Sequence, residues 1–167
     1  INPNKIALIG ASKGGELVLN LASRSDVFSA TIAIVPSHVS FPALTIMANT
    51  SSWSYKNQEV PFVPAPYKTI IPAVQGDLYS AHAMMLEDEE SVQSALIKVE
   101  NIQGPILLLS ATEDEQWPST TMTNQLIKRL EAHQFAHFYM HIPYEGTHTE
   151  PLQHFDDVFS FLEQHFK

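Results

Sequence analysis

The sequence of 167 residues lacks cysteine altogether. This absence excludes disulfides, thiolate nucleophiles and zinc sites that rely on cysteine, and it is compatible with a reducing compartment. Positive charge is scarce as well, since 9 lysines and arginines stand against 18 aspartates and glutamates and give a formal net charge of −9. Nucleic acids and anionic membrane surfaces are polyanions, so this acidic chain is a poor partner for either. We therefore expect no nucleic-acid partner.

The sequence also lacks any apolar run long enough to cross a membrane, so we expect no membrane span. It begins at Ile1 and enters an apolar run without the charged region and hydrophobic segment of a signal peptide. Together with the absence of cysteine, this predicts a cytoplasmic location. We interpret the chain as a fragment, or as the carboxyl-terminal part of a longer product. Its length is that of one domain, so we expect residues 1–167 to form a single, partial domain.

The most informative stretch places a serine between glycines and between two apolar runs. Gly10-Ala-Ser-Lys-Gly14 follows a short apolar run and precedes a longer one. The pattern fits the G-x-S-x-G nucleophile elbow, in which a serine hydroxyl is exposed on a sharp strand-to-helix turn. We expect a β-carbon at Gly10 or Gly14 to collide with the neighbouring chain. Ser12 is thus a candidate nucleophile, although the pentapeptide alone is a weak signal that an ordinary glycine-rich turn with a surface serine also fits.

The remaining chain predicts an α/β fold. Apolar runs typical of strands occupy residues 5–9, 30–36, 105–110 and 137–142. Helical periodicity covers residues 15–23, 119–133 and 155–166, and the last of these predicts an inner face of Phe155, Val158, Phe159, Leu162 and Phe166. This order is that of the carboxyl-terminal half of an α/β-hydrolase, with about four parallel strands and flanking helices.

Between the second and third predicted strands the periodicity fades. Residues 37–104 contain clustered prolines among aromatic residues, which cannot be the interior of a sheet. We interpret this stretch as an excursion or cap segment with one or two helices. The clearer helix spans 91–99, and the acidic run 87–90 before it is typical of a solvated helix start.

Two residues complete a candidate catalytic triad with Ser12. Asp114 lies four residues beyond the third predicted strand, and His148 lies between the last strand and the last helix. Serine, acid and histidine occur in this order in α/β-hydrolases, and all three would follow strand carboxyl ends. His148 would take the proton of Ser12 while Asp114 accepts the other N–H of the imidazole. The backbone N–H of Lys13 would be one oxyanion donor.

Alternatives remain open around this triad. Glu113 or Glu115 can replace Asp114 as the partner of the histidine, and Asp114 can instead cap the next helix. His38 follows the second predicted strand at the reactive edge and is the best further candidate for the substrate pocket. Five further histidines fit polar or surface positions, or have no evident role: His82, His133, His141, His154 and His165. No histidine pair forms the H-E-x-x-H motif of a zinc-binding helix, so we expect no metal site.

Five blocks of residues resemble one known family. They are Gly10-Ala-Ser-Lys-Gly-Gly-Glu-Leu17, Ile97-Lys-Val-Glu-Asn-Ile102, Gly104-Pro-Ile-Leu-Leu-Leu-Ser110, Glu113-Asp-Glu-Gln-Trp117 with Ser119, and Tyr144-Glu-Gly-Thr-His148 with Glu150-Pro151. They resemble the carboxyl-terminal catalytic domain of acyl-CoA thioesterases and bile acid-CoA:amino acid N-acyltransferases, relatives of dienelactone hydrolases. The resemblance implies a triad of Ser12, Asp114 and His148, without a cofactor, and makes Trp117 a second candidate for the substrate pocket.

The function that this resemblance implies is hydrolysis of acyl-CoA-type thioesters through an acyl-enzyme. Serine at position 12 favours hydrolysis, because the amidating transferases of the family tend to use cysteine. The alternatives are a carboxylesterase or dienelactone-type hydrolase, an acyl-CoA:amino acid N-acyltransferase, or an incomplete module that is not catalytic and needs a partner chain. Without the strands that precede the elbow in the family, the first strand would expose an open edge. We expect a homodimer partner or a preceding part of the protein to cover it.

Overall fold

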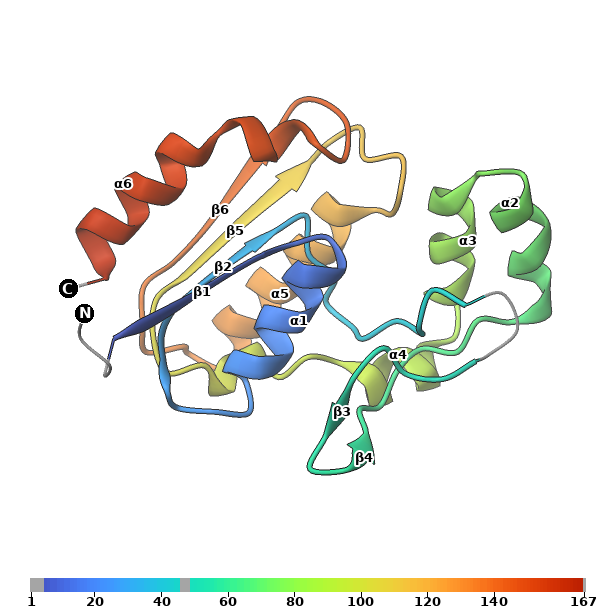
Figure 1. Ribbon diagram of the computed structural model, residues 1–167, viewed down its shortest axis with the longest axis horizontal. Helices are drawn as coiled ribbons and strands as arrows, with labels where there is room; N and C mark the ends of the chain where they lie inside the picture. Colours follow the sequence, from blue (N-terminus) through green and yellow to red (C-terminus); the bar gives the residue numbers. More distant parts are fainter. Residues whose placement is uncertain (1–4, 46–48, 167) are drawn as a thin grey trace. The chain divides into compact units, whose positions relative to one another are not determined.

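The computed structural model describes residues 5–45 and 49–166 (Figure 1). Residue contacts divide the chain into two compact units. The first, which we call the sheet unit, takes its described residues from Ile1–His38, Lys98–Glu113 and Ser119–Lys167. The second unit takes its described residues from Val39–Ile97 and Asp114–Pro118. In the described part of the chain, no helix combines the length and the apolar character that crossing a bilayer requires.

The sheet unit contains a four-stranded sheet in the order β1-β2-β5-β6. Its strands are β1 (Ile6–Ala11), β2 (Phe28–Ile34), β5 (Ile106–Ala111) and β6 (Tyr139–Tyr144). All three pairings are parallel, so the carboxyl ends of the four strands share one edge of the sheet. This confirms the predicted fold class, and each strand end lies within two residues of its predicted position. β2 ends before Val35, whose φ of 43° and following proline break the extended backbone.

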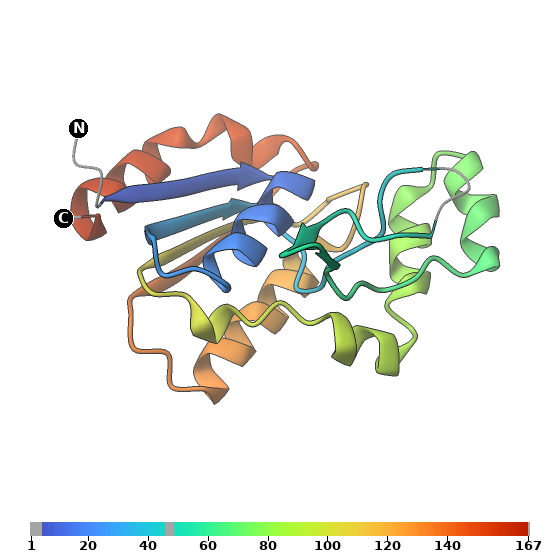
Figure 2. The same cartoon turned by 60° about the horizontal axis from the view of Figure 1, so that its bottom comes forward.

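Three helices cover the two faces of this sheet. They are α1 (Lys13–Ala22), α5 (Ser119–Ala132) and α6 (Phe155–His165), and the short 3-10 turns η2 (Val99–Asn101) and η3 (Glu150–Gln153) belong to the same unit. Figures 1 and 2 show α1 and α5 on one face and α6 on the other. Ile32, Ile34, Leu107 and Leu109 of the central strands pack with Phe161 of α6. Because both faces are covered, the central strands are continuously apolar.

The inner face of α6 differs from the predicted one. Val158 is buried and Leu162 packs against the core, as expected, but Phe159 is 57% exposed and Phe155 is also exposed. Phe161 is the buried phenylalanine of the helix. The phenylalanines of this helix lie on two neighbouring faces, and on each face apolar residues recur at steps of three and four. The periodicity alone therefore does not show which face is buried. Contact with β2 and β5 selects the face that contains Phe161.

His141 in β6 also contradicts its predicted outward position. Its Nε2 lies 2.8 Å from the Oγ of Ser110, a side chain on β5 that is fully buried. β6 is the last strand of the sheet, yet side chains on both of its faces contact other residues of the sheet unit. His141, which is paired with Leu108 in the parallel ladder, lies on one face, and Ile142 on the other face packs against the hydrophobic cluster that contains Leu109. The alternation of apolar and polar residues predicted the strand correctly, but it did not show that the face of β6 that carries His141 is turned towards α5.

The second unit contains short elements only. They are the antiparallel strands β3 (Ser54–Tyr55) and β4 (Gln58–Glu59), the 3-10 turn η1 (Tyr67–Thr69), and the helices α2 (Ile70–Val74), α3 (Leu78–Met85) and α4 (Glu89–Ala95). The excursion therefore holds more helices than predicted, and the helix expected over 91–99 begins earlier and ends at Ala95. Asp88 caps it by accepting the N–H of Ser91, which confirms the acidic run as a helix start.

Candidate active site

Ser12 lies between the last residue of β1 and the first residue of α1. Its backbone has φ 56° and ψ −122°, a combination that L-residues other than glycine rarely adopt and that costs about 1–3 kcal/mol. Its N–H donates to the carbonyl of Ile34 at 2.9 Å, which ties the turn to the end of β2. The strained residue is thus held from both sides, by the helix that follows it and by the neighbouring strand.

Glycines make this turn possible, although not the two that the sequence predicts. A β-carbon on Gly10 would lie 2.2 Å from the carbonyl oxygen of Gly14, so Gly10 is required as predicted. A β-carbon on Gly14 would meet nothing within 4 Å, so the prediction for Gly14 is wrong. Gly15 is the second close contact, because its β-carbon would lie 2.9 Å from the oxygen of Ile34. Gly14 contributes its backbone to the contact, whereas its own α-carbon faces open space.

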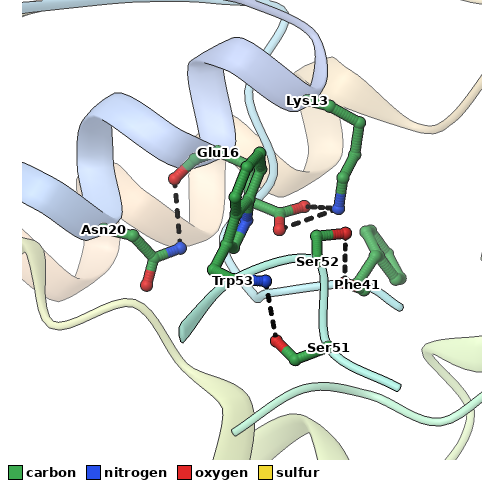
Figure 3. Close-up of polar contacts among 7 residues, drawn as sticks. All are labelled: Lys13, Glu16, Asn20, Phe41, Ser51, Ser52 and Trp53. Atoms are coloured by element: carbon green, nitrogen blue, oxygen red, sulfur yellow. Dashed lines mark hydrogen bonds and ion pairs between the residues drawn. The ribbon is translucent and has the colours of Figure 1, made fainter. Parts of the chain in front are cut away.

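Lys13, the proposed oxyanion donor, has its side chain folded along its own helix. Its Nζ donates to both carboxylate oxygens of Glu16 at 2.8 Å each (Figure 3). Glu16 is fully buried. Burial lowers the pKa of Lys13, and the Glu16 carboxylate opposes this shift. The pair therefore places two opposite charges in the first turn of α1. The Nδ2 of Asn20 adds a further hydrogen bond by donating to the backbone carbonyl of Glu16.

Figure 3 also shows polar contacts that lie within the second unit. The hydroxyl of Ser52 donates to the carbonyl of Phe41 at 3.2 Å, and the N–H of Trp53 donates to the hydroxyl of Ser51 at 3.2 Å. These bonds fix the chain between Phe41 and the β3 strand by pairing its polar groups locally.

His148 lies in the loop between β6 and η3, within the sheet unit. Two backbone hydrogen bonds join this loop to the segment after β5: the N–H of Thr112 donates to Tyr144 and the N–H of Glu113 donates to Gly146, each at 2.9 Å. The loops that follow β5 and β6 therefore adjoin at the carboxyl edge of the sheet, where ligands bind in parallel α/β folds. Ser12 follows β1 at the same edge.

Asp114 is the first residue of the segment Asp114–Pro118, which belongs to the second unit. Its Oδ1 accepts the N–H groups of Gln116 at 2.9 Å and Trp117 at 3.2 Å, an arrangement that fixes the turn after β5. Asp114 is 5% exposed, whereas Glu113 and Glu115 are exposed. The structure thus brings Ser12 and His148 to one edge of one unit and distinguishes Asp114 as the buried acid of the three.

His38 follows β2 and is only 8% exposed. Burial lowers its pKa to about 4, so the imidazole is neutral near pH 7. Its Nδ1 is buried and has no hydrogen-bond partner among the described residues. Buried polar atoms without a hydrogen-bond partner are uncommon in folded proteins.

Trp117, the other pocket candidate, is 2% exposed and lies in an aromatic cluster of the second unit. Its ring stacks on Phe41 at 5.8 Å and meets the ring of His82 edge-on at 5.3 Å. The Nδ1 of His82 lies 2.9 Å from the carbonyl of Leu78 and 3.0 Å from that of Gln116. The sequence left His82 without a role, because Gln116 and Trp117 are distant from it in the chain.

A serine–histidine contact that the sequence did not predict joins Ser110 and His141. Ser110 also contacts the hydroxyl of Thr120 at 2.9 Å, and Thr120 donates to the carbonyl of Ala111. Burial lowers the pKa of His141. Since Ser110 is fully buried, this contact links β5, β6 and α5 and does not offer a hydroxyl to a substrate. The described residues contain no group of three or more His, Asp or Glu arranged to hold a metal ion.

Comparison with solved structures shows the same fold in two known proteins. The acylaminoacyl peptidase of Pyrococcus horikoshii matches with a TM-score of 0.62 and 16% sequence identity, over 99% of this chain and 25% of that chain. Acetyl xylan esterase 1 from Thermoanaerobacterium matches with a TM-score of 0.51 and 16% identity, over 96% of this chain and 45% of that chain. At such identities the likeness shows the fold alone.

Comparison of sequences is more specific. Human acyl-coenzyme A thioesterase 1 is 30% identical over 131 residues, which cover 77% of this chain and 28% of that protein. Mouse acyl-coenzyme A thioesterase 6 is 32% identical over 141 residues, which cover 78% of this chain and 29% of that protein. The chain thus spans less than a third of these relatives. Residues 1–151 match the family described as "BAAT / Acyl-CoA thioester hydrolase C terminal", and the chain belongs to that family.

Proposed function

We propose that the protein is a serine hydrolase that cleaves acyl-CoA-type thioesters. The observation that carries the proposal is the backbone of Ser12, which is held at φ 56° between β1 and α1 at the carboxyl edge of a parallel sheet. Strain of this kind concentrates at functional sites. Membership of the family and likeness to acyl-coenzyme A thioesterases supply the substrate class.

The reaction follows from the roles of three side chains. The Ser12 hydroxyl attacks the thioester carbonyl while His148 takes its proton, and Asp114 accepts the other N–H of the imidazole. The carbonyl oxygen becomes an oxyanion, which the backbone N–H of Lys13 stabilises. The carbon–sulfur bond then breaks and the thiol leaves with the proton from His148. Water, activated by His148, attacks the acyl-enzyme, releases the carboxylic acid and restores the Ser12 hydroxyl.

We propose that His38 and Trp117 belong to the substrate pocket of this site. His38 supports the assignment with a buried Nδ1 that has no partner among the described residues. Because its imidazole is neutral, it offers one donor or one acceptor without a charge. His38→Phe is expected to raise KM for the thioester severalfold with kcat little changed. An unaltered KM would argue against a pocket role.

A reactive-serine probe tests the mechanism directly. In the protein that contains this chain, a fluorophosphonate should label Ser12, and Ser12→Ala and His148→Ala should each lower acyl-CoA hydrolysis by about 1,000-fold or more. Ser25→Ala and His133→Ala are matched controls in the same unit and should retain full turnover. Unchanged hydrolysis in Ser12→Ala or His148→Ala would contradict the triad.

The choice between hydrolysis and transfer needs a separate experiment, since the family name covers both. Free thiol and carboxylic acid are measured with and without an added amino acid as acceptor. A hydrolase releases equal amounts of thiol and acid in both conditions. An amide product that replaces the acid would instead identify an N-acyltransferase, and turnover of oxygen esters alone would identify an esterase.

We further propose that residues 1–167 belong to one hydrolase domain with residues 37–104 as its cap segment, and that added chain covers the β1 edge. β1 pairs with β2 alone in the described part of the chain, and Ile6 and Ile9 are 39% and 47% exposed. Sheet edges of this kind are normally covered. Native mass spectrometry of the 167-residue chain should show a dimer if a second copy covers the edge, and a monomer would contradict coverage by a second copy.

A further inference from the structure

The loop that carries His148 is anchored at both ends by side chains. The loop, residues 145–149, begins after Tyr144 and ends at Glu150, the first residue of η3. Tyr144 contacts two residues that lie beyond the loop, and Glu150 contacts one of them. Tyr144, Glu150, His154 and Asp157 thus form a connected set, which we call the loop clamp.

The two contacts of Tyr144 join the two ends of the loop, and the contact between His154 and Glu150 lies beyond it. The Tyr144 hydroxyl donates a hydrogen bond to the Asp157 carboxylate on α6. The Tyr144 ring stacks on the ring of His154, with centroids 4.0 Å apart and planes 10° apart. The Nε2 of His154 lies 3.2 Å from the Oε1 of Glu150. The chain before the loop is therefore fixed to the chain after it.

The hydroxyl of Tyr144 remains a donor over the working range of an enzyme. Burial raises the pKa of Tyr144, and the hydrogen bond and negative charge of Asp157 raise it further. The ring also packs against the hydrophobic cluster between the sheet and α6. The bond to Asp157 is therefore made from a ring that the core already holds.

The loop clamp also contacts the interior of the loop. Gly146 has φ 141°, and a β-carbon there would lie 2.8 Å from the Cγ of Glu150 and 2.9 Å from its Cβ. The stem of Glu150 thus lies directly over the backbone of Gly146. The carbonyl of Gly146 also accepts the N–H of Glu113. The backbone at Gly146 is therefore in contact with both the loop clamp and the segment that follows β5.

We propose that Tyr144 and Asp157 are positioning residues for His148. The inference rests on the proposed function, in which His148 is the general base. Neither residue touches the substrate; their bond fixes the loop so that the imidazole stays within reach of Ser12. Displacement of a catalytic group by about 1 Å can cost about 100-fold in rate.

Two variants remove the bond and a third preserves it. Tyr144→Phe deletes only the hydroxyl and keeps the ring on His154, while Asp157→Ala deletes the acceptor and Asp157→Asn keeps an acceptor oxygen. In the protein that contains this chain, Tyr144→Phe and Asp157→Ala should each lower kcat and the rate of fluorophosphonate labelling of Ser12 by about tenfold, with KM unchanged. Asp157→Asn should retain most of the rate. The double variant Tyr144→Phe/Asp157→Ala should be no slower than either single variant.

Tyr139→Phe, at the opposite end of β6, is the matched control and should label at the wild-type rate. Amide hydrogen exchange of Glu113 provides a readout that does not depend on catalysis, and it should rise in Tyr144→Phe and Asp157→Ala alone. Wild-type labelling rates in both variants would overturn the positioning role, whatever the exchange shows. If the wild-type protein is not labelled at all but exchange rises in the variants, the hydrolase proposal fails while the anchoring of the loop stands.

Discussion

Gly10 and Gly14 approach so closely that a β-carbon on Gly10 would lie 2.2 Å from the carbonyl oxygen of Gly14. The same position is 3.0 Å from a methyl carbon of Val18. The contact joins the end of β1 to the first turns of α1, and it is what allows the chain to reverse direction at Ser12. The two glycines therefore differ in their tolerance of a side chain.

Alanine substitution separates the two positions. Gly10→Ala should lower the free energy of unfolding by about 3 kcal/mol or more, because backbone atoms must move to admit the β-carbon. Gly14→Ala should instead raise it by about 0.5 kcal/mol, since the site is open and alanine favours a helix. Urea denaturation measures both. Equal destabilisation by the two substitutions would contradict the geometry of the turn.

The Lys13–Glu16 pair predicts a non-additive response. Lys13→Met removes the lysine from a fully buried carboxylate and should destabilise the protein by about 1–3 kcal/mol. The double variant Lys13→Met/Glu16→Gln should recover most of this loss, because neither of the two positions then carries a charge. Thermal denaturation of both variants and of the wild type gives the coupling.

The surface pair Lys68–Glu87 is the control for this experiment. Both of its side chains are more than half exposed, so Lys68→Met should change the free energy of unfolding by less than about 1 kcal/mol. A Lys13→Met variant that behaved like Lys68→Met would show that the buried pair contributes nothing.

The buried imidazole of His38 predicts a pH dependence of stability. Its pKa is lowered from 6.5 to about 4 in the folded protein, so protons bind preferentially to the unfolded chain. The penalty is absent above pH 6.5 and grows as the pH falls towards 4. Between pH 7 and pH 5 the wild type should lose on the order of 2 kcal/mol more than His38→Gln. Urea denaturation at the two pH values measures the difference, and parallel losses would contradict it.

Much of the fold could be predicted because its signals are local. The central strands β2 and β5 are continuous apolar runs, which only a sheet covered on both faces accommodates. The strain at Ser12 was likewise signalled by the glycines beside it. Order along the chain was sufficient to place His148 and the segment before Asp114 after neighbouring strands.

What the sequence did not predict depends on contacts between distant residues. His141 faces Ser110, and the orientation of α6 buries Phe161 in place of Phe159; both depend on register and rotation, which periodicity leaves open. The loop clamp joins Tyr144 to Asp157 across a loop and a 3-10 turn, and the tyrosine alone carries no signal of this contact. The role of Gly15, a residue of α1, was missed because its partner, Ile34, belongs to the strand β2.

The positive φ of Ser12 lowers the stability of the folded protein. Glycine would adopt this backbone at the lowest cost of any residue, because it has no β-carbon. A chain shaped by folding free energy alone would therefore place a third glycine between Gly10 and Gly14. The serine is less favourable than glycine for this backbone conformation, and what it supplies in return is a hydroxyl group.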